Sequence, residues 1–135
     1  MHRVLLAEDN KINQIVAAGT LRKLGYHVEI VDGGVDAVEA LRQREFSAVL
    51  MDVMMPDLDG YEATAQIRAL EEERSSAHTP IIGLSARAME GDREIALAAG
   101  FSDYLTKPLR ELELKDALER WIGAPVLLRA ESSTS

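Results

Sequence analysis

Short apolar runs alternate along the chain with longer segments of mixed polarity. The runs predict strands near residues 3–8, 27–31, 47–52, 80–84 and 103–106. Apolar residues at helical spacing between them predict helices near residues 11–24, 35–44, 60–71, 90–99 and 110–121. Because parallel strands need a crossover connection, this alternation is typical of a parallel sheet covered by helices.

Three of the predicted strands, at 3–8, 47–52 and 80–84, are apolar at nearly every position rather than at alternate positions. Such strands are buried on both faces, which indicates helices above and below the sheet. Right-handed crossovers leave few arrangements of the strands. We therefore predict an α/β, doubly wound fold with a five-stranded parallel sheet of order 2-1-3-4-5.

The composition changes this picture little. With 135 residues, 47% of them hydrophobic and 28% charged, the chain is expected to form one globular domain. The net charge of -8 argues against a nucleic-acid partner. No run reaches the roughly 18 apolar residues of a membrane span, and a strand begins at once, so we expect no signal peptide, no direct membrane contact and a cytoplasmic location. There is no cysteine for a disulfide or a thiolate site.

The character of the sequence changes after Trp121. Gly123-Ala124-Pro125 ends the last predicted helix, and the segment 131–135 is polar and without periodicity. We expect one domain over residues 1–122 and a tail or linker over residues 123–135.

Side chains suited to phosphoryl chemistry follow four of the apolar runs. Glu8 and Asp9 follow the first run, Asp52 the third, Ser85 the fourth and Lys107 the fifth. Because the carboxyl ends of parallel strands meet at one edge, three carboxylates, a hydroxyl and an ammonium should converge there. That edge is where doubly wound sheets bind their ligands.

Converging carboxylates favour a hard divalent cation such as Mg²⁺. Asp52 is then the candidate nucleophile, since a carboxylate can accept a phosphoryl group as an acyl phosphate. Lys107 offers a point charge to phosphoryl oxygens, and Ser85 a hydroxyl donor. An alternative stays open for each part: Glu8 and Asp9 suit the start of any helix, and lone lysines and serines are common.

These residues resemble the receiver domain of two-component signalling. The resemblance covers about residues 2–122 and implies a flavodoxin-like (βα)5 fold. The segments that carry it are Glu8-Asp9-Asn10, residues 51–60 around Asp52, Ser85-Ala86, and residues 104–108 (Tyr-Leu-Thr-Lys-Pro).

The resemblance implies a role for each of these residues. Asp52 becomes the phosphoacceptor, and Mg²⁺, with Mn²⁺ as an alternative, is held by Glu8, Asp9, Asp52 and the carbonyl of Met54. The resemblance further implies that Ser85 and Tyr104 are switch residues, the ring turning inward as Ser85 moves toward the phosphoryl group. It also implies a cationic Lys107 and a cis Lys107-Pro108 bond. Without that switch, Tyr104 is an ordinary edge-strand aromatic with a hydrated hydroxyl.

Residues 8–14 and 86–92 resemble more narrowly the receiver domains of hybrid sensor histidine kinases. This implies exchange of phosphoryl groups with a histidine kinase or a histidine phosphotransfer domain, in the cytoplasmic part of a membrane-bound kinase. Such a domain catalyses its own phosphorylation and dephosphorylation without being a turnover enzyme alone. Two alternatives are a pseudo-receiver that only binds proteins and a Mg²⁺-dependent phosphohydrolase. The latter typically carries Asp-x-Asp on its first strand, whereas Asp52 lies on the third.

The first predicted helix has two apolar stripes, of which one can face the sheet. The resemblance to receiver domains implies that Ala17, Leu21 and Leu24 face the core. The other stripe, together with Pro108, is the candidate docking surface for a phosphotransfer domain: Ile12, Ile15, Val16 and Gly19. Alternatively, this stripe is simply a half-buried helix face. A weaker candidate is the stretch Ile95, Leu97 and Ala98, and we expect the isolated domain to be monomeric.

Two further segments carry no site. Asp57-Leu58-Asp59-Gly60 resembles part of a calcium loop, but the alignment places Met55 and Gln66 where acidic ligands are required. The run of charged and serine residues at 71–76 is interpreted as a solvated helix end and loop.

Overall fold

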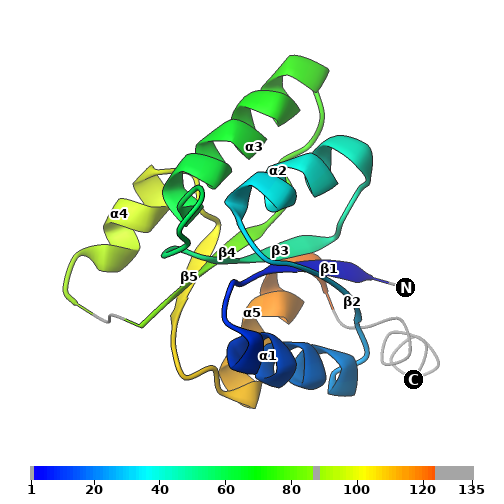
Figure 1. The fold of residues 1–135 in the computed structure, drawn as a ribbon, viewed down its shortest axis with the longest axis vertical. Helices are drawn as coiled ribbons and strands as arrows, with labels where there is room; N and C mark the ends of the chain where they lie inside the picture. The colour runs from blue at the N-terminus through cyan, green and yellow to red at the C-terminus, as the bar shows by residue number, and fades with distance from the viewer. Residues whose placement is uncertain (1, 87–88, 124–135) are drawn as a thin grey trace.

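The computed structural model describes residues 2–86 and 89–123 (Figure 1). In that part of the chain, five strands and five helices alternate as predicted. The strands are β1 (Arg3–Ala7), β2 (His27–Val31), β3 (Ala48–Asp52), β4 (Ile81–Ser85) and β5 (Asp103–Thr106). The helices are α1 (Lys11–Lys23), α2 (Gly34–Gln43), α3 (Gly60–Arg74), α4 (Asp92–Ala98) and α5 (Glu111–Ile122).

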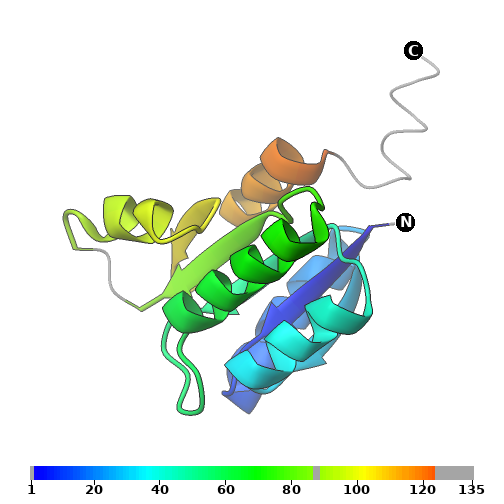
Figure 2. The same cartoon turned by 90° about the horizontal axis from the view of Figure 1, so that it is seen from above.

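The strands form one parallel sheet of order β2-β1-β3-β4-β5, which confirms the predicted topology. Helices α1 and α5 cover one face, and α2, α3 and α4 lie on the other (Figure 1). Helices α2 and α3 run side by side across the sheet (Figure 2). The fold is the expected flavodoxin-like, doubly wound sandwich.

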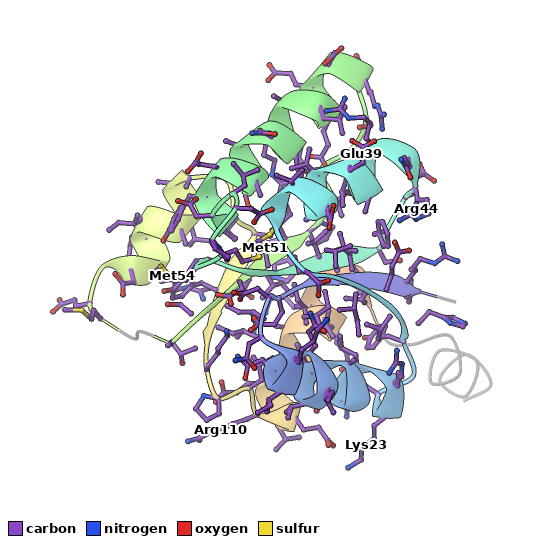
Figure 3. The ribbon with its side chains drawn as sticks, viewed as in Figure 1. Lys23, Glu39, Arg44, Met51, Met54 and Arg110 are labelled. Atoms are coloured by element: carbon purple, nitrogen blue, oxygen red, sulfur yellow. The ribbon has the colours of Figure 1, made fainter. Side chains whose placement is uncertain are left out.

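Alternate residues of each strand enter opposite cores. In β1, Val4 and Leu6 pack with the α1 and α5 layer, whereas Leu5 and Ala7 pack with the α2 and α3 layer. Met51 of β3 is likewise fully buried on the α2 and α3 side (Figure 3). Burial of one such side chain contributes about 1.5–3 kcal/mol, so both cores support the edge at which the strands end.

Helix α1 faces the sheet with the predicted stripe. Ala17 and Leu21 are buried, and Leu24 is partly buried against the same core. Gln14 and Ala18 are also buried, which the stripe did not predict. The opposite stripe is exposed: Ile12, Ile15, Val16 and Gly19.

The interpretation of residues 71–76 as a solvated end was wrong for Glu71. Helix α3 continues to Arg74 instead of ending at residue 71, and Glu71 is buried. Its carboxylate accepts a hydrogen bond from Arg68 at 2.7 Å and one from the Thr79 backbone N–H at 2.7 Å. A buried carboxylate needs such partners, and they come from a segment that the local pattern does not connect to it.

The predicted tail lies outside the described residues from residue 124 onward. Gly123 ends α5 with a positive φ of 80°, as its position after the helix predicts. Within the described part of the chain, we find no helix with the length and apolar character needed to cross a membrane.

Candidate functional site

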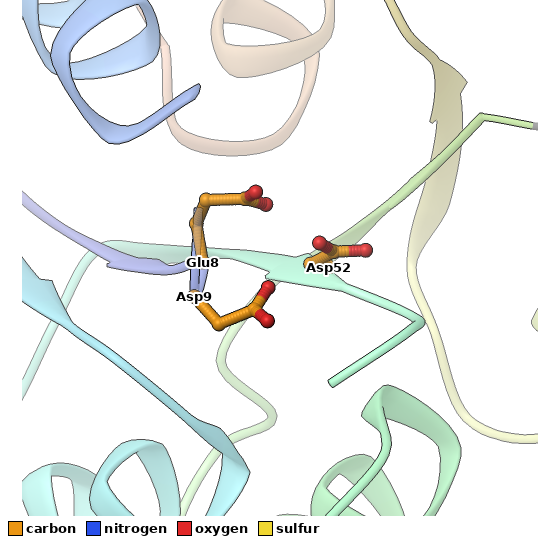
Figure 4. A group of neighbouring side chains, drawn as sticks. All are labelled: Glu8, Asp9 and Asp52. Atoms are coloured by element: carbon orange, nitrogen blue, oxygen red, sulfur yellow. The ribbon is translucent and has the colours of Figure 1, made fainter. Parts of the chain in front are cut away.

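Three carboxylates meet where β1 and β3 end. These strands are neighbours, with Ala7 paired to Met51, so Glu8, Asp9 and Asp52 emerge together. Each offers an oxygen, and these oxygens lie within 4.8 Å of one another (Figure 4). Glu8 and Asp52 are buried and Asp9 is exposed, so the cluster is open to solvent on one side. Carboxylates this close repel one another unless a cation lies among them.

Lys107 supplies part of the required positive charge. It follows β5, and its Nζ lies 3.0 Å from Glu8 Oε2 and 3.0 Å from Asp52 Oδ2. One ammonium among three carboxylates leaves an excess of negative charge. Oxygen ligands with excess negative charge fit a hard divalent cation such as Mg²⁺.

Burial and charge shift the pKa values inside the cluster. Burial raises the pKa of Glu8, and the adjacent Asp52 carboxylate raises it further. Hydrogen bonds from Asn13, at 2.9 Å, and from Lys107 act in the opposite direction. For Lys107, burial lowers the pKa, but the hydrogen bonds to Asp52 and Glu8 outweigh it and raise the pKa above its ordinary value. Lys107 is therefore a cation at neutral pH.

The loop that follows Asp52 packs directly against it. The Met54 N–H donates to Asp52 Oδ1 at 3.0 Å, so this peptide lies beside the acidic cluster. The Met54 side chain itself is exposed (Figure 3). Helix α3 begins close to Asp52. The approach is so tight that a Cβ on Gly60 would lie 2.6 Å from the Asp52 carbonyl oxygen. Asp59 caps this helix by accepting the Glu62 N–H at 2.8 Å.

Ser85 and Tyr104 lie on the next two strands. Ser85 ends β4 one residue beyond Leu84, the partner of Asp52 in the sheet, and it is buried. Tyr104 is 9% exposed as a residue and belongs to the core on the α2 and α3 side, so its ring faces inward in this structure. The Lys107 N–H donates to the Ser85 carbonyl at 2.7 Å. The Lys107-Pro108 bond is cis, as predicted.

The sequence did not predict the hydrogen bonds of three polar residues near the cluster. Asn13 donates to Glu8, as described above, and the Gln14 amide donates to the Glu8 carbonyl at 2.6 Å and to Asp32 at 2.6 Å. Asp57 accepts backbone N–H groups at the start of α2. Gln14 is a polar residue on the buried face of α1, and a buried polar side chain needs a hydrogen-bond partner. Its position could therefore have predicted such a contact.

The exposed stripe of α1 adjoins the acidic cluster. Ile12 and Ile15 are 72% and 73% exposed, and Val16 is 56% exposed. Between α1 and the loop after β5 lies a cavity of about 180 Å³. Its lining includes Glu8, Asn13, Val16, Leu84, Lys107, Pro108 and Leu109. Apolar surface therefore continues from α1 to the edge of the acidic cluster.

Two other surfaces are less well connected to the cluster. A larger cavity of about 630 Å³, lined in part by Arg44 and Phe46, lies where the strands begin and includes none of the three acidic residues. On α4, Ile95 and Leu97 are 59% and 40% exposed. We therefore place the functional site at the acidic cluster.

Comparisons with known proteins all point to one protein family. The profile described as the response regulator receiver domain matches residues 4–119. The sensor protein GacS of Pseudomonas syringae pv. syringae is 43% identical over 121 residues, which are 90% of this chain and 13% of GacS. The chain thus spans a small part of the sensor kinases that it matches.

Two solved structures are similar over nearly the whole chain. One is the receiver domain of the sensor histidine kinase PA1611 of Pseudomonas aeruginosa, solved with a magnesium ion in its active-site cleft. It is 48% identical, with a TM-score of 0.81, and the match covers 91% of this chain and 98% of that chain. The other is the receiver domain of the Saccharomyces cerevisiae response regulator Ssk1, solved with the histidine phosphotransfer protein Ypd1, at 32% identity and a TM-score of 0.84, covering 90% and 88%. This chain belongs to the response regulator receiver domain family.

Proposed function

We propose that this domain accepts a phosphoryl group on Asp52 from a phosphohistidine of a histidine kinase or a histidine phosphotransfer domain. The observation that carries the proposal is the joint position of three carboxylates and Lys107. Asp52 Oδ2 lies 3.0 Å from the Lys107 ammonium, and one carboxylate oxygen each of Glu8 and Asp9 lies within 4.8 Å of an Asp52 oxygen. A nucleophile, a counter-charge and a set of metal ligands thus lie at one point.

The donor set fits Mg²⁺, or Mn²⁺ as a cation with the same ligand preference. Glu8, Asp9 and Asp52 would supply carboxylate oxygens, and Met54 would supply its backbone carbonyl. The magnesium bound by the similar Pseudomonas aeruginosa receiver domain supports this assignment. When bound, the cation supplies positive charge that reduces the repulsion between an anionic nucleophile and an anionic donor.

In the transfer step, an Asp52 oxygen attacks phosphorus and the bond between phosphorus and the histidine nitrogen breaks. The electron pair of that bond stays on the imidazole, which takes up a proton, and an acyl phosphate forms on Asp52. Both Asp52 oxygens are held beforehand, one by the Met54 N–H and one by Lys107. After transfer, the Lys107 ammonium contacts the negatively charged phosphoryl oxygens instead of the Asp52 carboxylate. Attack of water on phosphorus releases phosphate and restores the carboxylate.

Ser85 and Tyr104 are the proposed switch. Ser85 ends the strand next to Asp52, where its hydroxyl can donate to a phosphoryl oxygen. Tyr104 lies on the neighbouring strand, with its ring close to Gly83 of β4. A shift of Ser85 would change the space available to this ring, which links phosphorylation to the core.

The proposed docking surface for the phosphotransfer partner combines the exposed stripe of α1 with Pro108. It is apolar, it lies beside the acidic cluster, and it opens into the cavity of about 180 Å³. Exposed apolar surface of this kind typically marks a protein contact. The complex of Ssk1 with Ypd1 supports a partner of this class.

The similarity to sensor kinases supports a place in a hybrid histidine kinase, in its cytoplasmic part. We propose that residues 1–122 form the receiver domain and that residues 123–135 are a tail or linker.

The test is transfer from a protein donor. A histidine phosphotransfer protein phosphorylated on histidine is mixed with this domain and Mg²⁺, and phosphate on each protein is followed with time. We expect phosphate to leave the donor and appear on this domain, and not on Asp52→Asn. Transfer to Asp52→Asn at the parent rate would contradict the proposal.

A further inference from the structure

The N-terminus of α2 is capped by a residue from another loop. Its N-cap residue, Gly33, has no side chain to accept the first helical N–H groups. Asp57, in the loop of residues 53–59 between β3 and α3, accepts them instead. The Gly34 N–H donates to Asp57 Oδ1 at 3.1 Å, and the Val35 N–H donates to Oδ2 at 3.2 Å.

The two segments approach so closely that side chains are excluded from one of them. A Cβ on Gly33 would lie 2.6 Å from Asp57 Oδ2, and a Cβ on Gly34 would lie 2.2 Å from the Leu58 carbonyl oxygen. An ordinary N-cap side chain at residue 33 would therefore collide with this loop. The pair of glycines permits a cap that joins two loops instead of one that serves α2 alone.

These contacts continue toward the acidic cluster through a group of residues that we call the belt: Gln14, Asp32, Gly34, Val35 and Asp57. On the β1 side, Gln14 joins the Glu8 carbonyl to Asp32, each at 2.6 Å. Asp32 directly precedes the two glycines. The belt thus connects the segment that carries Glu8 with the loop that follows Asp52.

The loop held by Asp57 contains the backbone group assigned to the cation. Its first part is fixed by the Met54 N–H to Asp52 Oδ1, at 3.0 Å, and its last part by Asp59 and Gly60 at the start of α3. Between these anchors, the Asp57 side chain joins the loop to α2 through two hydrogen bonds. Burial raises the pKa of Asp57, but hydrogen bonds from backbone N–H groups, first that of Leu58 and then those of Val35 and Gly34, outweigh it. They leave this pKa below its ordinary value, so the cap is charged at neutral pH.

We propose that Asp57 is a positioning residue for the cation site: by clamping the loop of residues 53–59 to α2, it holds the Met54 carbonyl in place for Mg²⁺. The inference rests on the proposed Mg²⁺ site. Residues that orient metal ligands from outside the coordination sphere commonly contribute to affinity.

The test compares two variants that loosen opposite ends of α2 in the full chain. Asp57→Ala removes the N-terminal cap. Arg74→Ala removes two hydrogen bonds at the other end, to the Leu41 and Arg42 carbonyl oxygens at 3.3 and 2.7 Å, far from the acidic cluster. Mg²⁺ dissociation constants are measured by calorimetric titration, and stability by urea unfolding. We expect Asp57→Ala to weaken Mg²⁺ binding about tenfold, and Arg74→Ala to leave it unchanged at a similar cost in stability.

Two further variants and one metal-free readout sharpen the test. Asp57→Asn keeps an acceptor for the Gly34 N–H and should retain most of the affinity, whereas Gly33→Ala should lower it by displacing Asp57. Without metal, the Met54 amide should exchange with solvent faster in Asp57→Ala but not in Arg74→Ala.

Unchanged Mg²⁺ affinity and Met54 exchange in Asp57→Ala would overturn the inference and leave the proposed function standing. Failure of the parent protein to bind Mg²⁺ would overturn both.

Discussion

Lys107→Ala tests the electrostatic balance of the site. In the structure, the ammonium lies 3.0 Å from one oxygen of Glu8 and from one oxygen of Asp52, whose side chains are only 2% and 6% exposed. Removal of one partner from a fully buried ion pair costs about 3–5 kcal/mol, because a buried charge is left uncompensated. Lys107 is itself 21% exposed, so water reaches the site, and we expect a loss of about 2 kcal/mol without Mg²⁺.

A divalent cation should replace the missing charge. Binding to the folded state at a hundred times the dissociation constant stabilises a protein by about 2.7 kcal/mol. We therefore expect saturating Mg²⁺ to recover the stability lost in Lys107→Ala. The assay is urea unfolding followed by far-ultraviolet circular dichroism, with Mg²⁺ or with a chelator.

Lys23→Ala is the matched control. Its ammonium also lies 3.0 Å from a carboxylate, that of Glu111, but the two side chains are 70% and 45% exposed (Lys23 is labelled in Figure 3). Such a surface pair contributes about 0–1 kcal/mol. Two results would refute this electrostatic explanation. One is a loss of stability in Lys107→Ala no larger than in this control, and the other is a Lys107→Ala variant that saturating Mg²⁺ does not restore toward the stability of the metal-free parent.

Three other perturbations have definite expected outcomes. Asp103 is buried at the start of β5, where burial raises its pKa but hydrogen bonds from Trp121, the Tyr104 N–H and Arg93 outweigh this and lower it. The stabilisation by the Asp103 carboxylate is therefore complete above the unfolded-state pKa near 3.8 and is lost as the pH falls through the lower folded-state value. In Asp103→Asn, the free energy of unfolding measured in urea should decrease less steeply with falling pH than in the parent protein. Gly60→Ala should lower the free energy of unfolding by about 1–3 kcal/mol, measured in urea, because its Cβ would lie 2.6 Å from a backbone oxygen. Ile15→Asp should slow phosphotransfer from a histidine phosphotransfer protein about tenfold and leave phosphorylation by acetyl phosphate unchanged, as expected for loss of about 1.4 kcal/mol of contact energy.

Each of these has an outcome that contradicts it. A steeper acid transition in Asp103→Asn than in the parent would show that the carboxylate is not stabilised in the fold. For Gly60→Ala, the comparison is Gly19→Ala, an exposed helical position with nothing within 4 Å, where alanine should be tolerated or stabilising. Equal effects at residues 19 and 60 would contradict the close approach. Equal slowing of Ile15→Asp with both donors would place the defect in the chemistry rather than in docking.

The sequence was sufficient to predict the elements, their order and the acidic cluster. Continuous apolar runs imply strands buried on both faces, and the polar residues that end parallel strands must meet at one edge. Glu8, Asp52 and Lys107 could therefore be placed together without coordinates. Geometry required only that one of the two stripes on α1 face the sheet, and the resemblance to receiver domains indicated which one.

The remaining features depend on contacts between segments far apart in the chain. Glu71 looks solvated from its charged neighbours, but it is buried by the segment before β4. Asp57 lies in a segment that resembles a failed calcium loop, and its role depends on how that loop meets α2 once the sheet has formed. Local periodicity carries no information on such hydrogen bonds.

The most direct test of the central claim is the intact mass of the protein after incubation with acetyl phosphate and Mg²⁺. We predict the added mass of one phosphoryl group, lost when a chelator replaces Mg²⁺ and absent from Asp52→Asn, which keeps an acceptor for the Met54 N–H. A folded parent protein that binds Mg²⁺ but gains no phosphoryl group, or a phosphorylated Asp52→Asn variant, would contradict the assignment of Asp52 as the phosphoacceptor.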